Sequence, residues 1–165
     1  LFKLSVSTSS ASTLDEIISS RRRGAAPEPG WQLSEAQLNT LFDTLDGIVL
    51  PRAVSRYIAR LVSATHPDGG EATDSVRQYV SYGASPRAAI GIDEAARAQA
   101  LLEGRPTVGF EDVKAVAKPT LNHRLILSYQ AKFDRIDQFS LIDQLLDGLD
   151  ETGLNLPSDM QVESA

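Results

Sequence analysis

The chain has 165 residues, a formal net charge of −6 at pH 7 and a sequence pI of about 4.9. This acidic balance disfavours a nucleic-acid-binding protein, which usually carries a basic face. The chain has no cysteine, which excludes a disulfide framework, a thiolate metal site and a cysteine nucleophile. No apolar run approaches the ~18 residues that span a bilayer, and no secretory signal is visible. We expect a cytoplasmic protein that consists of one domain of ordinary size, or of one small domain with flanking pieces.

The first residues of the chain have the pattern of a strand. Residues 1–6 alternate apolar and polar side chains, as a half-buried strand does. A single strand has no pairing partner here, so we expect the chain to begin inside a larger protein. Thr13 and Glu16 then have the spacing of a capping box, which predicts a short helix over 14–22. The basic run 21–23 suits the end of that helix, where the dipole favours cations.

A loop and two further helices are predicted next. Gly, Ala and Pro residues over 24–30 indicate the loop, and we expect Trp31 directly after it to anchor in the core. Ser34 and Gln37 form a second capping box, which predicts a helix that ends near Gly47. The apolar side chains of this helix form one stripe. They are Leu38, Leu41, Phe42 and Leu45.

The third helix is predicted from Pro51, a residue that suits the first helical turn, to about His66. The turn signal over 67–70 ends it. Its stripe of apolar residues should face the core. That stripe consists of Val54, Tyr57, Ile58, Leu61 and Val62. Residues 71–82 fit either a short helix or an extended segment.

The C-terminal half predicts three more helices, over 86–103, 110–123 and 140–149. Ser85 is a good N-cap and Pro86 a good first residue for the first of them, and Gly104 suits its end. We expect Pro119 to kink or interrupt the second helix. The tail after residue 153 should be frayed. The predicted fold class is therefore all-α, a small helical bundle with one short N-terminal strand.

Arg87 is the best candidate for a functional residue. It falls in the first turn of the helix that Ser85 and Pro86 begin. The helix dipole does not favour a cation there, so an arginine at this place suggests a function. One candidate function is to bind a phosphate group that the same helix end attracts. The alternative is a surface arginine whose aliphatic stem covers apolar side chains.

The other polar residues indicate neither catalysis nor metal binding. His66 and His123 lie far apart, and neither has a carboxylate at metal-ligand spacing. We expect the pair His123 and Arg124 to pack against a neighbouring helix rather than to take part in catalysis. Ser85 lacks an adjacent base, so its role should be capping. The chain has neither a GxxxxGK[ST] nor a GxGxxG motif, so we expect it to hold no nucleotide by itself in the usual Walker fashion.

Two acidic pairs have simple explanations in the predicted helices. Asp93 and Glu94 should lie on a solvated helix face, with a partner contact as the alternative. Glu111 and Asp112 suit the first turn of a helix, where the dipole favours anions.

Four segments in order resemble the C-terminal lid of MoxR-type AAA+ ATPases. They are 83–87, 100–105, 108–113 and 121–125. The resemblance implies that residues 1–12 end the α/β ATPase core with its last strand, that 13–150 form the helical lid, and that 151–165 are a flexible tail. The Walker motifs would lie upstream. This segment alone would therefore not be an enzyme, whereas the parent protein would hydrolyse ATP.

The resemblance also implies a role for Arg87, which falls on the sensor-2 position of the family. There it would contact the γ-phosphate of ATP and couple lid movement to the nucleotide state, with Ser85 and Pro86 supporting the helix start. ATP and Mg²⁺ would be cofactors of the parent protein. The implied partners are the ATPase core of the same chain, further copies in a hexameric ring and a von Willebrand A domain protein. The alternative is a stand-alone helical protein-interaction module without a nucleotide role.

Overall fold

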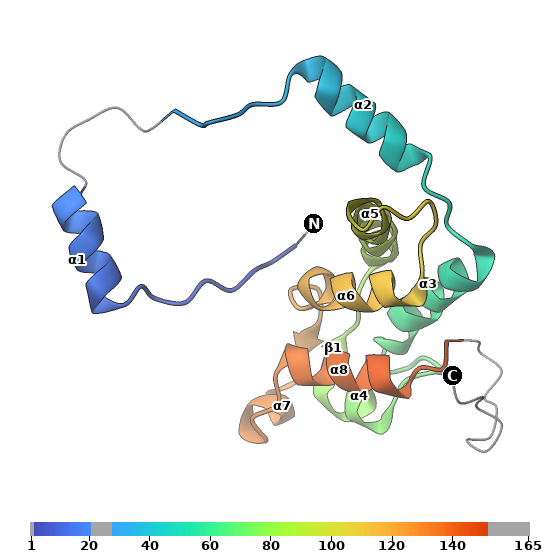
Figure 1. Cartoon of the computed structure of the whole chain (residues 1–165). Helices are drawn as coiled ribbons and strands as arrows, with labels where there is room; N and C mark the ends of the chain where they lie inside the picture. The colour runs from blue at the N-terminus through green and yellow to red at the C-terminus, as the bar shows by residue number, and fades with distance from the viewer. Residues whose placement is uncertain (1, 21–27, 152–165) are drawn as a thin grey trace, which may run out of the picture.

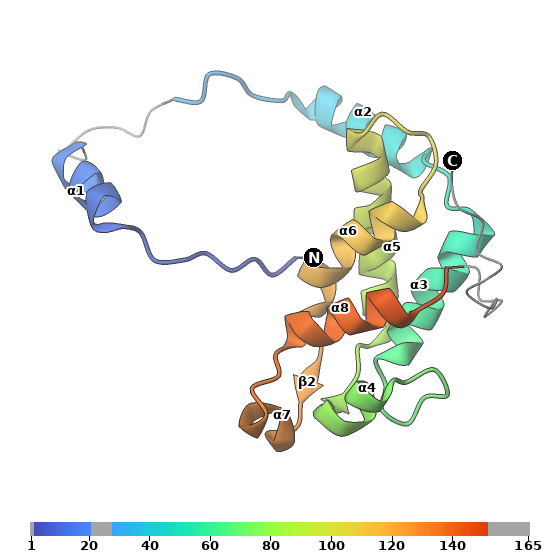
Figure 2. The same cartoon turned by 60° about the horizontal axis from the view of Figure 1, so that its bottom comes forward.

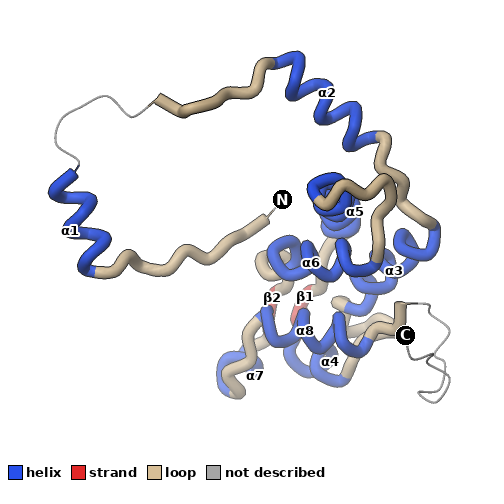
Figure 3. The backbone as a smooth tube through the Cα atoms, in the orientation of Figure 1, coloured by secondary structure: helices blue, strands red, loops and turns tan. Residues whose placement is uncertain are grey.

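The computed structural model describes residues 2–20 and 28–151 and is mostly helical in this part (Figures 1 and 3). The helices are α1 (Ala11–Ser20), α2 (Glu35–Asp46), α3 (Arg52–Ala64), α4 (Asp74–Tyr79), α5 (Pro86–Leu102), α6 (Phe110–Leu121), α7 (Tyr129–Phe133) and α8 (Gln138–Gly148). Two short strands, β1 (Val80–Tyr82) and β2 (Ile126–Leu127), complete the fold. The predicted all-α helical bundle is thus confirmed.

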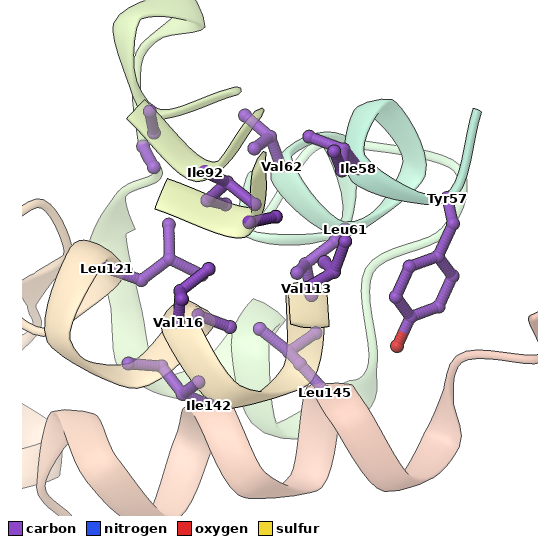
Figure 4. Packing of buried hydrophobic residues seen from close by; sticks show 14 of the residues in the cluster. Tyr57, Ile58, Leu61, Val62, Ile92, Val113, Val116, Leu121, Ile142 and Leu145 are labelled. Carbon is purple, nitrogen blue, oxygen red and sulfur yellow. The ribbon is translucent and has the colours of Figure 1, made fainter. Parts of the chain in front are cut away.

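The core lies between α3, α5, α6 and α8, with the most extensive helix contact between α5 and α6 (Figure 4). All five apolar residues predicted for the stripe of α3 are buried. Alanines occupy three of the four buried positions of α5, and these small side chains let α6 approach closely. Buried aliphatic residues of α6 and α8 close the other side; they include Val113, Val116, Leu121, Ile142 and Leu145.

Two segments that the sequence left ambiguous or unassigned form a small antiparallel ribbon. Val80 of β1 pairs with Leu127 of β2, and Tyr82 pairs with Ile126, with an irregular register between them. The N–H of Ser128 extends the pairing by donating to the carbonyl of Tyr79 at 2.8 Å. The ribbon connects the chain before α5 to the chain after α6, and it thereby fixes where α5 begins.

The N-terminal segment differs from its predicted strand. Residues 2–10 adopt neither helix nor strand, because no strand in the described part pairs with them; residue 1 lies outside that part. The segment nevertheless contacts the bundle through Lys3. Its N–H donates to the carbonyl of Pro119 at 3.0 Å, and Asn122 Nδ2 donates to the carbonyl of Lys3 at 2.9 Å.

Helix α1 begins earlier than predicted. Ser10 Oγ accepts the N–H of Thr13 at 3.2 Å, so Ser10 caps the helix and Thr13 lies inside its first turn. The predicted capping box of Thr13 and Glu16 is therefore wrong. The basic run 21–23, with which the predicted helix ends, and most of the predicted loop lie outside the described residues.

The apolar faces of α1 and α2 are exposed, and neither helix buries a residue. Figures 1 and 2 show α1 well away from the bundle. The capping box of α2 forms as predicted, with Ser34 Oγ accepting from Gln37 N–H at 3.2 Å. Trp31, however, is 77% exposed in the extended chain before α2, so its predicted role as a core anchor is wrong. No described element packs over it.

Pro51 and Pro119 occupy other helix positions than predicted, and the linker before α3 is held by a short bridge. Pro51 is the N-cap of α3 rather than its first helical residue. Helix α6 continues through Pro119, whose missing N–H falls in the last turn, and the predicted interruption is wrong. Val49, in the linker before α3, forms a parallel bridge with Thr107, and its N–H donates to the carbonyl of Pro106 at 2.9 Å.

Candidate functional site

Arg87 is the second residue of α5 and is exposed. Within the described residues its side chain makes no hydrogen bond or ion pair. Pro86 begins the helix as predicted, and Ser85 occupies the N-cap position, but the Ser85 side chain makes no capping hydrogen bond. The polar groups at this helix end therefore remain available to a ligand.

The start of α5 is held in place by the end of α3. Thr65 Oγ1 accepts the N–H of Ala84 at 2.9 Å and donates to the carbonyl of Val62 at 2.6 Å. His66 Nε2 lies 2.9 Å from the carbonyl oxygen of Ala84, to which it donates as the Nε2–H tautomer. Thr65 and Ala84 are fully buried. Sequence reasoning missed this contact, because it joins segments that are remote in the chain.

Gly83 allows the two segments to approach this closely. A Cβ atom at Gly83 would lie 2.7 Å from the carbonyl oxygen of Thr65 and 2.8 Å from Cγ of His66. Such distances are too short for real side chains, so only glycine fits without a backbone shift. One turn later, Ala88 is fully buried against the core. Together these contacts fix the position of the Arg87 Cα.

A second arginine lies over the same helix. Arg124 follows α6, and its guanidinium packs on Gly91 of α5, where a Cβ atom would lie 3.0 Å from Nη1. Nη1 is buried and has no hydrogen-bond partner among the described residues. The expectation that the His123–Arg124 pair packs on a neighbouring helix holds for Arg124, whereas His123 itself is exposed.

Two positive charges lie near His123 at this junction. Although the residue is exposed overall, partial desolvation of the ring lowers the pKa of His123 below its usual value, and the positive charges of Arg124 and Lys3 lower it further. Lys3 belongs to the N-terminal segment that hydrogen-bonds the end of α6. The charges of Arg124 and Lys3 thus lie close together in a protein whose net charge is negative.

The loop between α5 and α6 is closed by an ion pair whose carboxylate is buried and whose guanidinium is partly exposed. Arg105 Nη1 donates to Asp112 Oδ2 at 2.7 Å, and the N–H of Gly109 donates to the same oxygen at 2.8 Å. The Arg105 guanidinium holds the pKa of Asp112 below its usual value, although burial of the carboxylate opposes this effect. Sequence reasoning assigned Asp112 only to the helix dipole and missed its partner.

The two residues of the acidic pair on α5 have different surroundings, and the solvated face was predicted correctly only for Glu94. Asp93 Oδ1 accepts from Arg97 Nε at 2.9 Å, and Arg97 also donates to the carbonyl of Ile48. Asp93 thereby helps to fasten the linker before α3 to α5. Glu94 is exposed, as expected for a solvated face.

The described residues contain neither a candidate metal site nor a candidate membrane span. No group of three or more His, Cys, Asp or Glu side chains there could hold a metal ion. None of the helices in that part is both long and apolar enough to cross a membrane.

Comparisons with known proteins agree on one family. Residues 72–145 match the family model of the AAA lid domain. The whole chain is 34% identical to Chaperone MoxR1 of Mycobacterium tuberculosis and covers 46% of that protein. It is also 32% identical to the uncharacterized protein YeaC of Bacillus subtilis, over 57% of this chain and 27% of that protein.

A solved structure shares the fold. The structure of a proposed ATPase from Cytophaga hutchinsonii matches 90% of this chain with a TM-score of 0.75 and 25% sequence identity. The chain covers 46% of that structure, so it spans less than half the length of these relatives. Residues 72–145 therefore carry an AAA lid domain, and the chain is similar to the part of MoxR-type AAA+ ATPases that contains this lid.

Proposed function

We propose that Arg87 is the sensor-2 arginine of this lid, which binds the γ-phosphate of ATP and couples lid movement to the nucleotide state. The observation that carries the proposal is an exposed arginine that has no partner among the described residues. It lies at a helix start that Thr65, His66 and Gly83 hold in place. A preorganised guanidinium can bind phosphate oxygens in a bidentate manner. ATP can favour a closed position of the lid over an open one only through contacts, such as this one, that it makes in the closed position alone.

The cofactors ATP and Mg²⁺ belong to this proposal. Arg87 suits the phosphates, whereas the described residues offer no cluster of metal ligands, so we assign Mg²⁺ no ligand in this chain. When bound with ATP, the ion would neutralise phosphate charge during hydrolysis. The chain's own contribution is to bind and orient the γ-phosphate.

The partners form the second part of the proposal. The apolar side chains that residues 2–20 expose suit packing against the ATPase core of the same chain, because such surfaces mark interaction sites. They include Phe2, Leu4, Leu14, Ile17 and Ile18. The complete protein would assemble into a ring, a hexamer, and act in the cytoplasm as a chaperone-like remodeller with a von Willebrand A domain protein. The match to the AAA lid domain and the similarity to a MoxR chaperone favour this proposal over a stand-alone interaction module.

The sensor role is tested by Arg87→Ala in the intact ATPase. Loss of a charge-assisted contact worth about 1.5–3 kcal/mol should lower ATP turnover about ten- to hundredfold. Arg56→Ala is the matched control, because Arg56 is also an exposed arginine without an ion pair in the described part. The melting temperature of both variants should stay near that of the wild type. Unchanged turnover in Arg87→Ala would remove the assignment.

A further inference from the structure

Arg124 carries a positive charge that the described part of the chain does not balance. Its Nη1 is buried without a hydrogen-bond partner, and no carboxylate there forms an ion pair with it. Taking a guanidinium out of water without a partner is costly, because the charge loses its hydration. A partly buried guanidinium without a partner therefore indicates that an anion binds at this position.

The position of Arg124 relates it directly to Arg87. Gly91, on which the Arg124 guanidinium packs, follows Arg87 by four residues on α5. Residues at this spacing lie on the same face of a helix, with Cβ atoms about 5–6 Å apart. The absence of a Cβ at Gly91 leaves the space that Nη1 occupies. The guanidinium of Arg124 therefore lies against a position that is about one helical turn from Arg87 on the same face of α5.

The charged groups around this face leave the pair of arginines without an anion. Lys3 and His123 lie on the side of the N-terminal segment, and neither is negative. Glu94 lines the groove that also contains Gly91, but it forms no ion pair in the described part. An anion supplied from outside these residues would balance both arginines at once.

We propose that Arg124 is a second phosphate-binding residue of the lid, which contacts the phosphates of the same nucleotide as Arg87 and is held in place by Gly91. The proposal rests on the proposed sensor function and deepens it. Two guanidinium groups on one helix face could bind different oxygens of a polyphosphate, since each presents a planar fork of donors. The alternative anion is a carboxylate of the ATPase core, which would present the same kind of oxygen atoms to Arg124.

The test measures ATP and ADP affinity and thermal stability of the intact ATPase, with and without nucleotide, in the variants Arg124→Gln, Arg124→Lys and Arg87→Ala. Arg56→Gln serves as the control for a general loss of positive charge. We expect Arg124→Gln to weaken nucleotide binding about tenfold and to reduce the rise in melting temperature that nucleotide causes. Its melting temperature without nucleotide should equal or exceed that of the wild type, because an unbalanced charge is removed. Arg124→Lys should have an intermediate affinity.

Gly91→Ala provides an independent test that leaves the arginine in place. The new Cβ would lie 3.0 Å from Nη1 and would displace the guanidinium. Alanine also favours the helix more than glycine does. We therefore expect this variant to be more stable without nucleotide and yet to bind nucleotide more weakly. If Arg124 had only a structural role, Gly91→Ala would not raise stability and weaken nucleotide binding at the same time.

The outcomes separate the two proposals. If Arg124→Gln lowers the melting temperature without nucleotide and leaves nucleotide affinity unchanged, Arg124 pairs with a carboxylate or only packs, and the inference is wrong. If Arg124→Gln has wild-type affinity while Arg87→Ala is impaired, the inference fails and the sensor function stands. If only Arg124→Gln is impaired, Arg124 binds phosphate and the sensor assignment of Arg87 fails.

Discussion

The close approach of the two segments that precede Arg87 predicts a large effect for Gly83→Ala. The added Cβ would lie 2.7 Å from the carbonyl oxygen and 2.8 Å from the carbonyl carbon of Thr65. These are backbone atoms, so the segments must separate. Overpacking of this kind costs about 1–3 kcal/mol, and loss of the hydrogen bond from Ala84 to Thr65 adds about 1 kcal/mol. We expect the free energy of unfolding to fall by about 2–4 kcal/mol.

The assay is urea unfolding of the 165-residue chain, followed by circular dichroism. The matched control is Gly70→Ala, because a Cβ there would meet no atom within 4 Å. That variant should stay within about 0.5 kcal/mol of the wild type or gain slightly. The melting temperature of Gly83→Ala should fall by roughly 10 °C. If Gly83→Ala were as stable as Gly70→Ala, the contact would not hold the start of α5 as argued.

Two further predictions concern buried polar groups. Asp112→Asn should lower the free energy of unfolding by about 2–3 kcal/mol, less than a fully buried pair would lose, because the Arg105 side chain is 31% exposed. The folded-state pKa of Asp112 is lowered, so the ionised carboxylate stabilises the fold above the unfolded pKa of about 3.9. This stabilisation is lost as the pH falls below that value. If the difference in stability between Asp112→Asn and the wild type were the same at pH 6 and pH 3, the ion pair would not contribute as argued. Tyr57→Phe should be neutral or stabilise the protein by up to about 1 kcal/mol, because the buried hydroxyl has no hydrogen-bond partner in the described part; a clear loss of stability in urea unfolding would show that the hydroxyl has one.

Local signals explain why much of the fold could be predicted. Ser34 with Gln37 marks the start of α2, and Gly104, with φ of 72°, ends α5 as its sequence position indicates. These signals act within one turn of the chain, so a single sequence contains them. The stripe of α3 was predicted for the same reason, since its spacing follows directly from helix geometry.

Contacts between remote segments account for what the sequence did not reveal. The β1–β2 ribbon pairs only a few residues, and its strands lie more than 40 residues apart in the chain. An apolar stripe predicts a buried face, yet α2 buries none of its residues, because burial depends on what packs against the face. Trp31 is exposed for the same reason.

One part of the candidate site could be predicted from local sequence signals, and the other part could not. Arg87 could be found from its place in the first turn of a helix and from the resemblance to the lid family. Its support by Thr65 and His66, and the packing of Arg124 on Gly91, could not, because each joins helices that are far apart in sequence. A histidine near a helix end and a glycine within a helix are weak signals alone. Their meaning depends on the tertiary contact.

The central claim is that Arg87 recognises the γ-phosphate, and the most direct measurement is the ratio of the ADP and ATP dissociation constants. It should be measured for the wild type and Arg87→Ala of the intact ATPase, with a non-hydrolysable ATP analogue in place of ATP. The account predicts that Arg87→Ala weakens binding of the analogue about tenfold or more and leaves ADP affinity nearly unchanged. An equal loss for both nucleotides, or no loss for the analogue, would contradict it.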